Sequence, residues 1–532
     1  ETGTKGVGDF SSSVSTPSRI LSFFGRLNYN LMERYLLTVT FRADGSSKFA
    51  PSNRWGYFPA AALGWRMSEE AFLNDVDWLD NLKLRVSYGE VGNDGINSSL
   101  WSQNWEATSD KRYQGAVNGA FLPSYSLGAD MANKDLKWET TITRNIGVDF
   151  GFFNNRLTGT IDAYWNTTKD LLMKTAIPGI TGFTSTYANV GQTSNKGIEI
   201  ALQGVLVKTR DWNVTAGFNI NFNRGKVDKL ADNVTGLYGT EWATSSTFPK
   251  SDYVLKEGRP VGLVRGLTAD GFYTTDDFTY ENGVYTLKEG VADVSSAVFP
   301  NYHLHNGMNE RPAGQLAYPG MAKFKDLNDD GIINDDDVDV IGDMTPVHTG
   351  GFNINATYKN FDLGLYFNWS YGNEIYNVNK LAALYGYKEG AVYENKLSIV
   401  KDCYKIYDVV NGELVALTTP EQLNAANANA KLPLAYSENG YVSTLGIEDG
   451  SYLRLNTLTL GYTLPKSMLQ KAGISNLRVY GSIYNVFTIT GYSGIDAEVS
   501  TSTSTKTYPQ LGMDWGTYPR ARSFVLGVNL SF

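Results

Sequence analysis

The stretch that decides the fold reads Trp212-Asn-Val-Thr-Ala-Gly-Phe-Asn-Ile-Asn-Phe222. Apolar side chains occupy every second position, and small or polar residues stand between them. Because successive side chains of a β-strand point to opposite faces of its sheet, the pattern gives this segment one apolar and one polar face. It predicts a long strand whose two faces meet different surroundings.

The same alternation recurs in Leu157–Trp165, Phe361–Trp369 and Phe524–Phe532. The complete pattern predicts thirteen strands, at residues 20–30, 34–43, 55–66, 81–91, 137–153, 155–169, 190–206, 211–225, 348–359, 361–372, 451–464, 476–489 and 519–532. Many of them exceed the roughly 5–6 residues usual in globular proteins and reach the roughly 9–11 that a tilted strand needs to cross a bilayer. The alternation changes phase within 451–464, which predicts a β-bulge near Asn456.

The connections between these strands alternate strictly between short and long. The short or modest ones lie at 30–33, 67–80, 154–155, 208–210, 359–360 and 465–475, and the second and last of these look partly helical. The long ones lie at 44–54, 92–136, 170–189, 226–347, 373–450 and 490–518. An outer-membrane β-barrel has this layout, with short periplasmic turns and long extracellular loops. The sequence therefore predicts an all-β, transmembrane, antiparallel up-and-down barrel whose C-terminus at Phe532 is periplasmic.

The predicted strand number is odd, whereas single-chain bacterial barrels have an even number of strands. The chain also begins without a starting Met or a signal peptide. We therefore expect residues 1–19 to be the end of an extracellular loop or of a preceding strand, and residues 20–532 to be the C-terminal part of a larger barrel. The alternatives are a secreted β-sandwich, which has no reason to sort its loops by length, and a β-helix, which would show a sequence repeat.

Composition excludes several classes of protein. Charged residues make up 19% of the chain, against roughly 25% in an average soluble domain, and aromatic residues reach 13%. The net charge of −9 argues against nucleic acid as a partner. No stretch is long and apolar enough for a transmembrane helix. The single cysteine, Cys403, excludes a disulfide within the chain, and we expect it to be an inert loop residue.

Several segments resemble one family. Arg34-Tyr-Leu-Leu-Thr-Val-Thr-Phe-Arg-Ala-Asp-Gly-Ser-Ser-Lys-Phe49, followed by Asn53-Arg-Trp-Gly-Tyr-Phe-Pro-Ala60, resembles the SusC/RagA family of TonB-dependent transporters of Bacteroidetes. Further similar segments, in the family's order, are Gly64-Trp-Arg66, Leu82-Lys-Leu-Arg-Val-Ser-Tyr-Gly89, Gly92-Asn93, Leu136-Lys-Trp-Glu-Thr-Thr141, Asn189-Val-Gly191, Asn195-Lys-Gly-Ile-Glu199, Phe324-Lys-Asp-Leu-Asn-Asp-Asp-Gly-Ile-Ile333 and Tyr518-Pro-Arg-Ala-Arg-Ser-Phe-Val-Leu-Gly-Val-Asn-Leu-Ser-Phe532. The similarity therefore extends over most of the chain.

The resemblance implies a plugged barrel of about twenty-two strands in the lipid bilayer of the bacterial outer membrane. It implies a non-enzymatic importer of oligosaccharides or peptides, powered by the TonB complex and covered by a SusD-like surface lipoprotein. It also implies that the TonB box, the plug and the first strands belong to a remaining barrel and plug segment absent from this chain. The alternatives are a passive outer-membrane porin or adhesin and an outer-membrane barrel enzyme, for which the sequence offers no Ser-His-Asp spacing.

The sharpest local motif is Asp326-Leu-Asn328-Asp-Asp330-Gly331-Ile332-Ile-Asn334-Asp-Asp-Asp337. It places oxygen-bearing side chains at loop positions 1, 3, 5 and 9, Gly at 6 and a carboxylate at 12, which is the spacing of a calcium loop. The last position is Asp rather than the usual bidentate Glu. We predict a structural Ca²⁺ held by Asp326, Asn328, Asp330, the Ile332 carbonyl, Asn334 and Asp337. The alternative is a solvated acidic turn.

Aromatic residues fall into two groups. Those at strand ends, such as Tyr29, Trp55, Trp138 and Tyr371, are predicted to form girdles at the membrane interface. In the long loops, aromatic faces stack on sugar rings or pack a loop core, and Tyr273 belongs to this group. The candidate ligand contacts are Trp101, Trp105, Tyr238 and Trp242.

Two histidines, His303 and His305, lie in the longest predicted external loop. Both a metal site and an active site on the outer rim would need them. No third ligand stands at metal spacing, so we expect a surface pair.

Overall fold

The computed structural model describes residues 18–103, 105–108, 115–117, 120–122, 124–128, 130–231, 234–243, 247–299, 311–384, 397–435, 440–469, 473–501 and 510–532. The chain divides into two compact units. The first holds the described residues of Glu1–Asn155, Thr160–Lys196 and Asp228–Asn233. The second holds those of Arg156–Gly159, Gly197–Val227 and Val234–Phe532.

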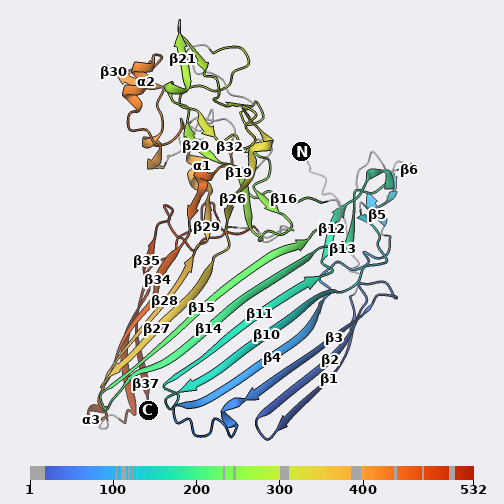
Figure 1. Ribbon diagram of the computed structural model, residues 1–532, viewed down its shortest axis with the longest axis vertical. Helices are drawn as coiled ribbons and strands as arrows, with labels where there is room; N and C mark the ends of the chain where they lie inside the picture. Colours follow the sequence, from blue (N-terminus) through green and yellow to red (C-terminus); the bar gives the residue numbers. More distant parts are fainter. Residues whose placement is uncertain are drawn as a thin grey trace, which may run out of the picture. The chain divides into compact units, whose positions relative to one another are not determined.

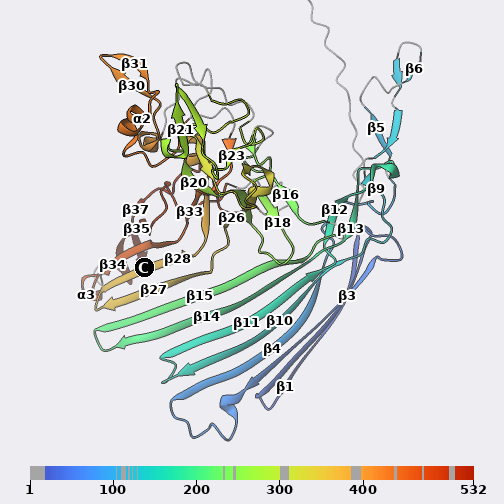
Figure 2. The ribbon, with the colours of Figure 1, turned by 45° about the horizontal axis from the view of Figure 1, so that its top comes forward.

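One antiparallel sheet contains thirteen long strands, and each corresponds to a strand predicted from the sequence. Their order in the sheet is β1 (Ile20–Leu31), β2 (Tyr35–Ser46), β3 (Trp55–Arg66), β4 (Leu79–Asn93), β10 (Glu139–Phe152), β11 (Leu157–Lys169), β14 (Gln192–Lys208), β15 (Trp212–Lys229), β27 (His348–Tyr358), β28 (Phe361–Tyr371), β34 (Tyr452–Thr463), β35 (Asn476–Thr490) and β37 (Ser523–Ser531). Neighbours in the sheet follow chain order, and Figures 1 and 2 show β1 to β4 of the first unit as adjacent long arrows. The predicted up-and-down topology is confirmed.

The predicted β-bulge is also confirmed. Tyr366 pairs with Thr457 and Phe367 with Leu455, so the pairing with β28 skips Asn456. The pairing of β34 with β35 shifts at the same point. The two modest connections are partly helical, as expected, and contain a 3₁₀ turn at Met67–Glu69 and the short helix α3 (Lys466–Leu469).

The apolar face of the second unit carries a cross-strand aromatic ladder. Phe352 stacks on Phe367 with ring centroids 4.3 Å apart, and Phe218 stacks on Trp369 at 5.7 Å. Farther along the sheet, Leu526 is 88% exposed on β37. Such exposed apolar surface requires a partner other than water, and a lipid bilayer supplies one.

The polar face of the first unit is crossed by an ion-pair cluster. The Arg85 guanidinium lies 2.8 Å from an Asp149 oxygen and 3.0 Å from an Asp162 oxygen. These three residues come from β4, β10 and β11, so the cluster links neighbouring strands. The period-two pattern thus sorts charge and apolar surface onto different faces.

One girdle prediction is wrong. Trp138 is buried rather than at a lipid interface, because it packs against Phe49 and Phe58, and its indole N–H donates to the Arg54 carbonyl at 2.8 Å. The connection between β2 and β3 covers the end of β10, so this ring closes a small core. Tyr29, Trp55 and Tyr371 are exposed, as a girdle requires.

Short strands fill the long connections of both units. In the first unit these are β5 (Trp105–Thr108), β6 (Gly115–Val117), β7 (Ala120–Leu122), β8 (Ser124–Leu127), β9 (Asp130–Met131), β12 (Leu172–Ala176) and β13 (Ser185–Asn189). In the second unit they are β16 (Leu237–Gly239), β17 (Thr247–Phe248), β18 (Tyr253–Leu255), β19 (Leu263–Leu267), β20 (Ala269–Phe272), β21 (Phe278–Glu281), β22 (Val284–Leu287), β23 (Asp293–Val294), β24 (Ala322–Phe324), β25 (Ile332–Ile333), β26 (Val338–Asp343), β29 (Glu374–Asn377), β30 (Tyr407–Val410), β31 (Glu413–Ala416), β32 (Gly440–Tyr441), β33 (Ile447–Asp449) and β36 (Met513–Asp514). Two helices accompany them, α1 (Val378–Leu384) and α2 (Pro420–Asn427).

The two longest connections of the second unit fold together. Their shared core contains Tyr273, Tyr285 and Tyr318, all fully buried. The Tyr285 hydroxyl donates to the Thr418 carbonyl at 3.0 Å, which joins one connection to the other. Of the two roles that the sequence left open for Tyr273, the structure shows core packing, since its ring fills this core.

The last long connection is fastened to the sheet by a buried arginine. Arg454 on β34 is paired with Asp496, lies 3.0 Å from a Glu498 oxygen and donates to the Thr488 hydroxyl at 2.9 Å. Glu498 also pairs with Arg520 at 3.0 Å. These bonds fix the start of the connection that follows β35.

Candidate substrate-binding site

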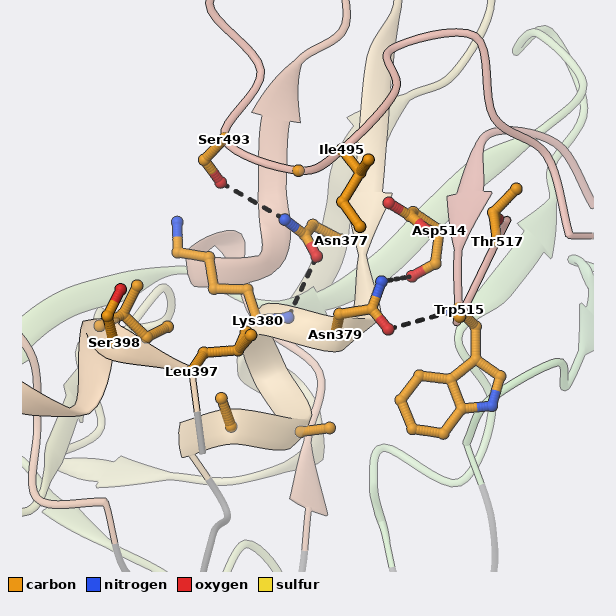
Figure 3. A pocket seen from close by; sticks show the side chains of 15 residues that line it. Asn377, Asn379, Lys380, Leu397, Ser398, Ser493, Ile495, Asp514, Trp515 and Thr517 are labelled. Atoms are coloured by element: carbon orange, nitrogen blue, oxygen red, sulfur yellow. Dashed lines mark hydrogen bonds between the residues drawn. The ribbon is translucent and has the colours of Figure 1, made fainter. Parts of the chain in front are cut away.

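A cavity of about 510 Å³ lies among the folded connections of the second unit. Its described lining comes from four stretches, at 377–383, 397–399, 493–495 and 514–517, and Figure 3 shows the side chains that surround it. The volume falls within the range of roughly 300–1,000 Å³ that is usual for small-ligand sites. The cavity is therefore large enough for a small ligand.

Helix α1 forms the first wall. Val378 and Leu381 are buried in a core with Tyr376, which fixes the rotation of the helix. At 3.6 residues per turn, the positions between them lie on a different face. Asn379 and Lys380 consequently line the cavity.

Asparagine side chains tie the walls together. The Asn379 amide donates to the Asp514 carbonyl at 3.2 Å, and its oxygen accepts the Gly516 N–H at 3.0 Å. Through these two hydrogen bonds, Asn379 joins α1 to residues 514–516. The Asn377 side-chain oxygen accepts the Lys380 N–H at 3.0 Å, and so caps the start of α1.

Glu448 on β33 accepts hydrogen bonds from several residues of this wall. Its carboxylate accepts the Lys380 ammonium at 3.1 Å, the Asn377 amide at 3.2 Å, and both the hydroxyl and the N–H of Ser493 at 2.9 Å. Burial opposes ionisation of this carboxyl, but the Ser493 bonds and the Lys380 charge outweigh it and hold the pKa of Glu448 below its ordinary value. The Glu448 side chain is thus an ionised carboxylate at neutral pH.

Asp514 lines the cavity, and Tyr492, which is not part of the described lining, holds its carboxylate. The Tyr492 hydroxyl donates to the Asp514 carboxylate at 2.7 Å, and burial, followed by this bond, raises the pKa of Tyr492. The ring lies over Gly494, where an added Cβ would stand 2.3 Å from a ring carbon. Only glycine permits this close approach.

The mouth of the cavity is apolar. Leu397 and Trp515 are about half exposed, and Ile495 is 77% exposed. The Thr517 hydroxyl oxygen is buried and has no hydrogen-bond partner among the described residues. The rim of the cavity is therefore largely apolar.

The four aromatic residues proposed as ligand contacts lie elsewhere, and their role stays a prediction. Trp105 on β5 is 65% exposed, and Trp101 precedes it in a half-buried position. Tyr238 is half exposed, with the Arg265 guanidinium over its ring at 4.8 Å. Trp242 packs edge-on against Tyr376, with ring centroids 6.4 Å apart.

Asp252 holds the Trp242 segment in place. It is fully buried and accepts the N–H groups of Glu241, Trp242 and Ala243 at 2.8, 2.8 and 3.1 Å. Burial raises the pKa of Asp252 despite these three bonds. These bonds fix the backbone that carries the Trp242 ring.

Sequence reasoning missed the residues that line the cavity. Asn379 and Gly516 are 137 positions apart, and no periodicity marks either one. The only signal was Trp515, an aromatic residue next to a glycine in a long predicted loop.

The predicted calcium loop has the expected turn. Asp326 accepts the Gly331 N–H at 2.7 Å, and Asp337 accepts the N–H groups of Leu327 at 2.7 Å and Asn334 at 2.8 Å. Gly331 has φ of 84°, the left-handed conformation that the sharp turn requires. The oxygen donor set fits a hard cation. Among the described residues, however, no group of three or more His, Cys, Asp or Glu side chains is placed to hold a metal, so Ca²⁺ stays a prediction.

His303 and His305 lie outside the described residues. Cys403 is buried, and burial raises the pKa of its thiol to about 11. A thiol with so high a pKa is protonated at neutral pH and a poor nucleophile.

Long antiparallel strands with one apolar face, joined by short turns and by folded long connections, define the wall of a transmembrane β-barrel. The described residues include no helix that is long and apolar enough to cross a membrane. The family model for "TonB dependent receptor-like, beta-barrel" matches residues 2–486. The chain belongs to this family, whose members are outer-membrane proteins.

Individual relatives indicate which type of TonB-dependent receptor the chain resembles. The chain is 31% identical to TonB-dependent receptor P3 of Formosa agariphila, over 98% of this chain and 46% of that protein. It is also 31% identical to TonB-dependent receptor SusC of Bacteroides thetaiotaomicron, over 98% of this chain and 44% of SusC. The RagAB peptide transporter structure matches with a TM-score of 0.71 and 25% identity, over 97% of this chain and 48% of that one.

The chain thus belongs with the TonB-dependent receptors of the SusC/RagA type, which confirms the resemblance seen in its sequence. It spans about half the length of the curated relatives it matches. These relatives are named as receptors rather than enzymes.

Proposed function

We propose that the chain is the barrel part of a TonB-dependent nutrient importer that takes up oligosaccharides or peptides together with a SusD-like lipoprotein lid. The observation that carries the proposal is the cavity, which is built into the folded connections of a family member and has firmly hydrogen-bonded walls. A pore that only lets solutes diffuse needs no such site. A transporter that captures a nutrient before opening does.

The partners follow from the family and from the strand count. A lid lipoprotein covers the external connections, and the TonB complex pulls on a plug. A remaining barrel and plug segment completes the wall, because the thirteen strands described here are an odd number. The bilayer contacts the apolar face, and the C-terminus at Phe532 is periplasmic.

A passive porin or adhesin is the second candidate, and an outer-membrane enzyme the third. Neither is favoured by a specific observation. Burial raises the pKa of the Cys403 thiol, which makes it a poor nucleophile.

The experiment measures uptake in the source bacterium with and without TonB, and with and without the neighbouring lipoprotein. The probes are fluorescently labelled casein peptides and maltooligosaccharides. Import of at least one probe that needs both TonB and the lipoprotein supports the proposal. Import that persists without TonB would show a passive pore instead.

The calcium loop is proposed as a brace for the connection between β15 and β27. Asp326 and Asp330 would bind Ca²⁺, which would offset the repulsion between their carboxylates. Asp326→Ala with Asp330→Ala should abolish Ca²⁺ binding measured by calorimetry and speed protease cleavage of this connection. Asp335→Ala with Asp336→Ala removes the same charge from positions outside the donor set. This pair should leave Ca²⁺ binding and the rate of protease cleavage unchanged. Equal effects of the two double substitutions would show that the segment is a solvated turn. Protease resistance that does not change when Ca²⁺ is chelated would show the same.

A further inference from the structure

We propose that Arg144, Lys169 and Lys196 bind the phosphate group of a lipid in the outer leaflet of the membrane. The three residues come from β10, β11 and β14, which are consecutive neighbours in the thirteen-stranded sheet. The inference rests on the proposed orientation, with the long connections outside. It goes beyond nutrient import, because it assigns a lipid site to the outer surface of the barrel.

Arg144 lies on the apolar face of the sheet. Asp149, on the same strand, belongs to the ion-pair cluster of the polar face, and the two positions differ by an odd number. Successive side chains point to opposite faces, and the pairing of β10 with β4 has no irregularity between these positions. Arg144 is paired with Tyr88, and the next pair on this face joins Ile146 to Val86, both of which are exposed. The guanidinium therefore leaves the sheet on the side of exposed apolar residues.

Lys169 and Lys196 leave the sheet on the same face. On β11, Lys169 differs by an odd number of positions from Asp162, which belongs to the polar cluster. A Cβ added to Gly204 of β14 would stand 3.9 Å from the side chain of Leu157 on β11. Even-numbered residues of β14 therefore share a face with odd-numbered residues of β11, so Lys196 lies on the face that carries Lys169.

The three cations lie toward the ends of their strands that meet the long connections. β10 and β14 begin after such connections, and β11 ends at one. Trp165, on the same face of β11, is about half exposed, and tryptophan rings favour the headgroup zone. The Arg144 guanidinium donates to the Thr167 hydroxyl at 3.4 Å, which ties it to β11. Charge on the lipid face is tolerated best at this interface, where headgroups meet it.

None of the three cations forms an ion pair with a described residue. Acidic residues at this end of the first unit are engaged elsewhere. Glu90 accepts the Tyr88 hydroxyl at 2.5 Å, and Asp170 pairs with Lys137 at 3.0 Å. Asp228 accepts two side-chain hydrogen bonds from β14, at 3.2 and 2.9 Å. The guanidinium and the two ammonium groups thus remain as positive charge that no described carboxylate neutralises.

A phosphate on a lipid fits this arrangement. Phosphate oxygens accept charge-assisted hydrogen bonds from guanidinium and ammonium groups. Positive side chains next to a bilayer attract anionic headgroups, and each one strengthens the attraction. A soluble phosphate would meet the same cations, but exposed apolar side chains on the same face, such as Ile161 and Ile198, offer contact to acyl chains as well. The two kinds of contact together specify a lipid.

The test uses the purified full-length transporter in detergent, titrated with lipid and followed by native mass spectrometry. The probes are monophosphoryl lipid A, the same lipid after enzymatic removal of its phosphate, and inorganic phosphate. Monophosphoryl lipid A should bind with about a hundredfold higher affinity than its dephosphorylated form. Inorganic phosphate at equal concentration should not displace it.

Charge-neutralising variants locate the site. Lys169→Gln with Lys196→Gln should weaken binding of monophosphoryl lipid A roughly 25-fold, because each cation near the membrane surface contributes about fivefold. Addition of Arg144→Gln should bring the loss to roughly a hundredfold. Both lysines are exposed, so their double variant tests the site even if the triple variant does not assemble. The matched control neutralises three exposed cations at the short turns and should leave the affinity unchanged; its substitutions are Lys208→Gln, Arg210→Gln and Lys359→Gln.

Three results would overturn the inference: equal affinity for the two lipids, an equal loss in the control, or displacement of the lipid by inorganic phosphate. An epitope tag inserted at Gly182, between β12 and β13, checks the orientation. Antibody binding to intact cells supports the outer leaflet, and binding only after permeabilisation overturns that assignment. Import that does not depend on TonB, with the lipid preference kept, would remove the importer and leave this site standing.

Discussion

Replacing Arg454 by methionine should release the connection that follows β35. The Arg454 side chain is only 3% exposed, and that of its partner Asp496 9% exposed, so the pair is buried. Removal of one member of a buried pair leaves the other charge uncompensated, at a cost of about 3–5 kcal/mol. The pair with Glu498, whose side chain is 32% exposed, adds no more than about 1 kcal/mol. A loss of about 4 kcal/mol corresponds to a roughly thousandfold larger opening equilibrium.

The assay is hydrogen exchange of residues 491–501 in the full-length transporter. Arg478→Met is the matched control, because Arg478 also pairs with a carboxylate, Asp362, but does not contact this connection. Arg454→Met with Asp496→Asn should recover more than half of the lost protection, since no buried charge then lacks a partner. Unchanged exchange in Arg454→Met, or the same increase in Arg478→Met, would refute the reasoning.

Three further outcomes are expected. Gly494→Ala should displace the Tyr492 ring and speed hydrogen exchange at residues 491–501, because its new Cβ would overlap the ring; unchanged exchange would contradict this packing. Since the folded-state pKa of Glu448 is lowered, its contacts stabilise the protein above the ordinary value of 4.5 and are lost as pH falls through the folded value. Exchange at 491–501, corrected for intrinsic rates, should therefore rise only below pH 4.5, and a rise near neutral pH would oppose the assignment. Phe218→Arg should destabilise the folded barrel by roughly 2–4 kcal/mol in urea unfolding, and Asn219→Arg much less; equal costs would contradict the assignment of faces.

The sheet was predictable because the membrane acts on every residue of a strand. Lipid on one side and a polar interior on the other enforce alternation, as in Trp212–Phe222, and the phase slip at Asn456 was visible for the same reason. The predicted strand at 55–66 coincides with β3. At 519–532 the prediction began too early, because β37 starts only at Ser523 and the preceding residues are not paired in the sheet.

The cavity was not predictable, because its walls depend on contacts between distant segments. Nothing local distinguishes Asn379 from other loop asparagines until its amide is found bonded to Gly516. Loop aromatics pose the same difficulty. Tyr273 and Trp515 look equivalent in the sequence, yet one is fully buried in a core and the other is half exposed at the cavity.

The central claim is that this barrel drives nutrients inward rather than letting them diffuse. The most direct measurement is the ratio of periplasmic to external concentration of a labelled peptide at steady state, in cells with and without TonB. Energised import predicts a ratio well above one that falls to one when TonB is removed. A ratio of one in both strains, with the full-length protein present in the membrane, would contradict it.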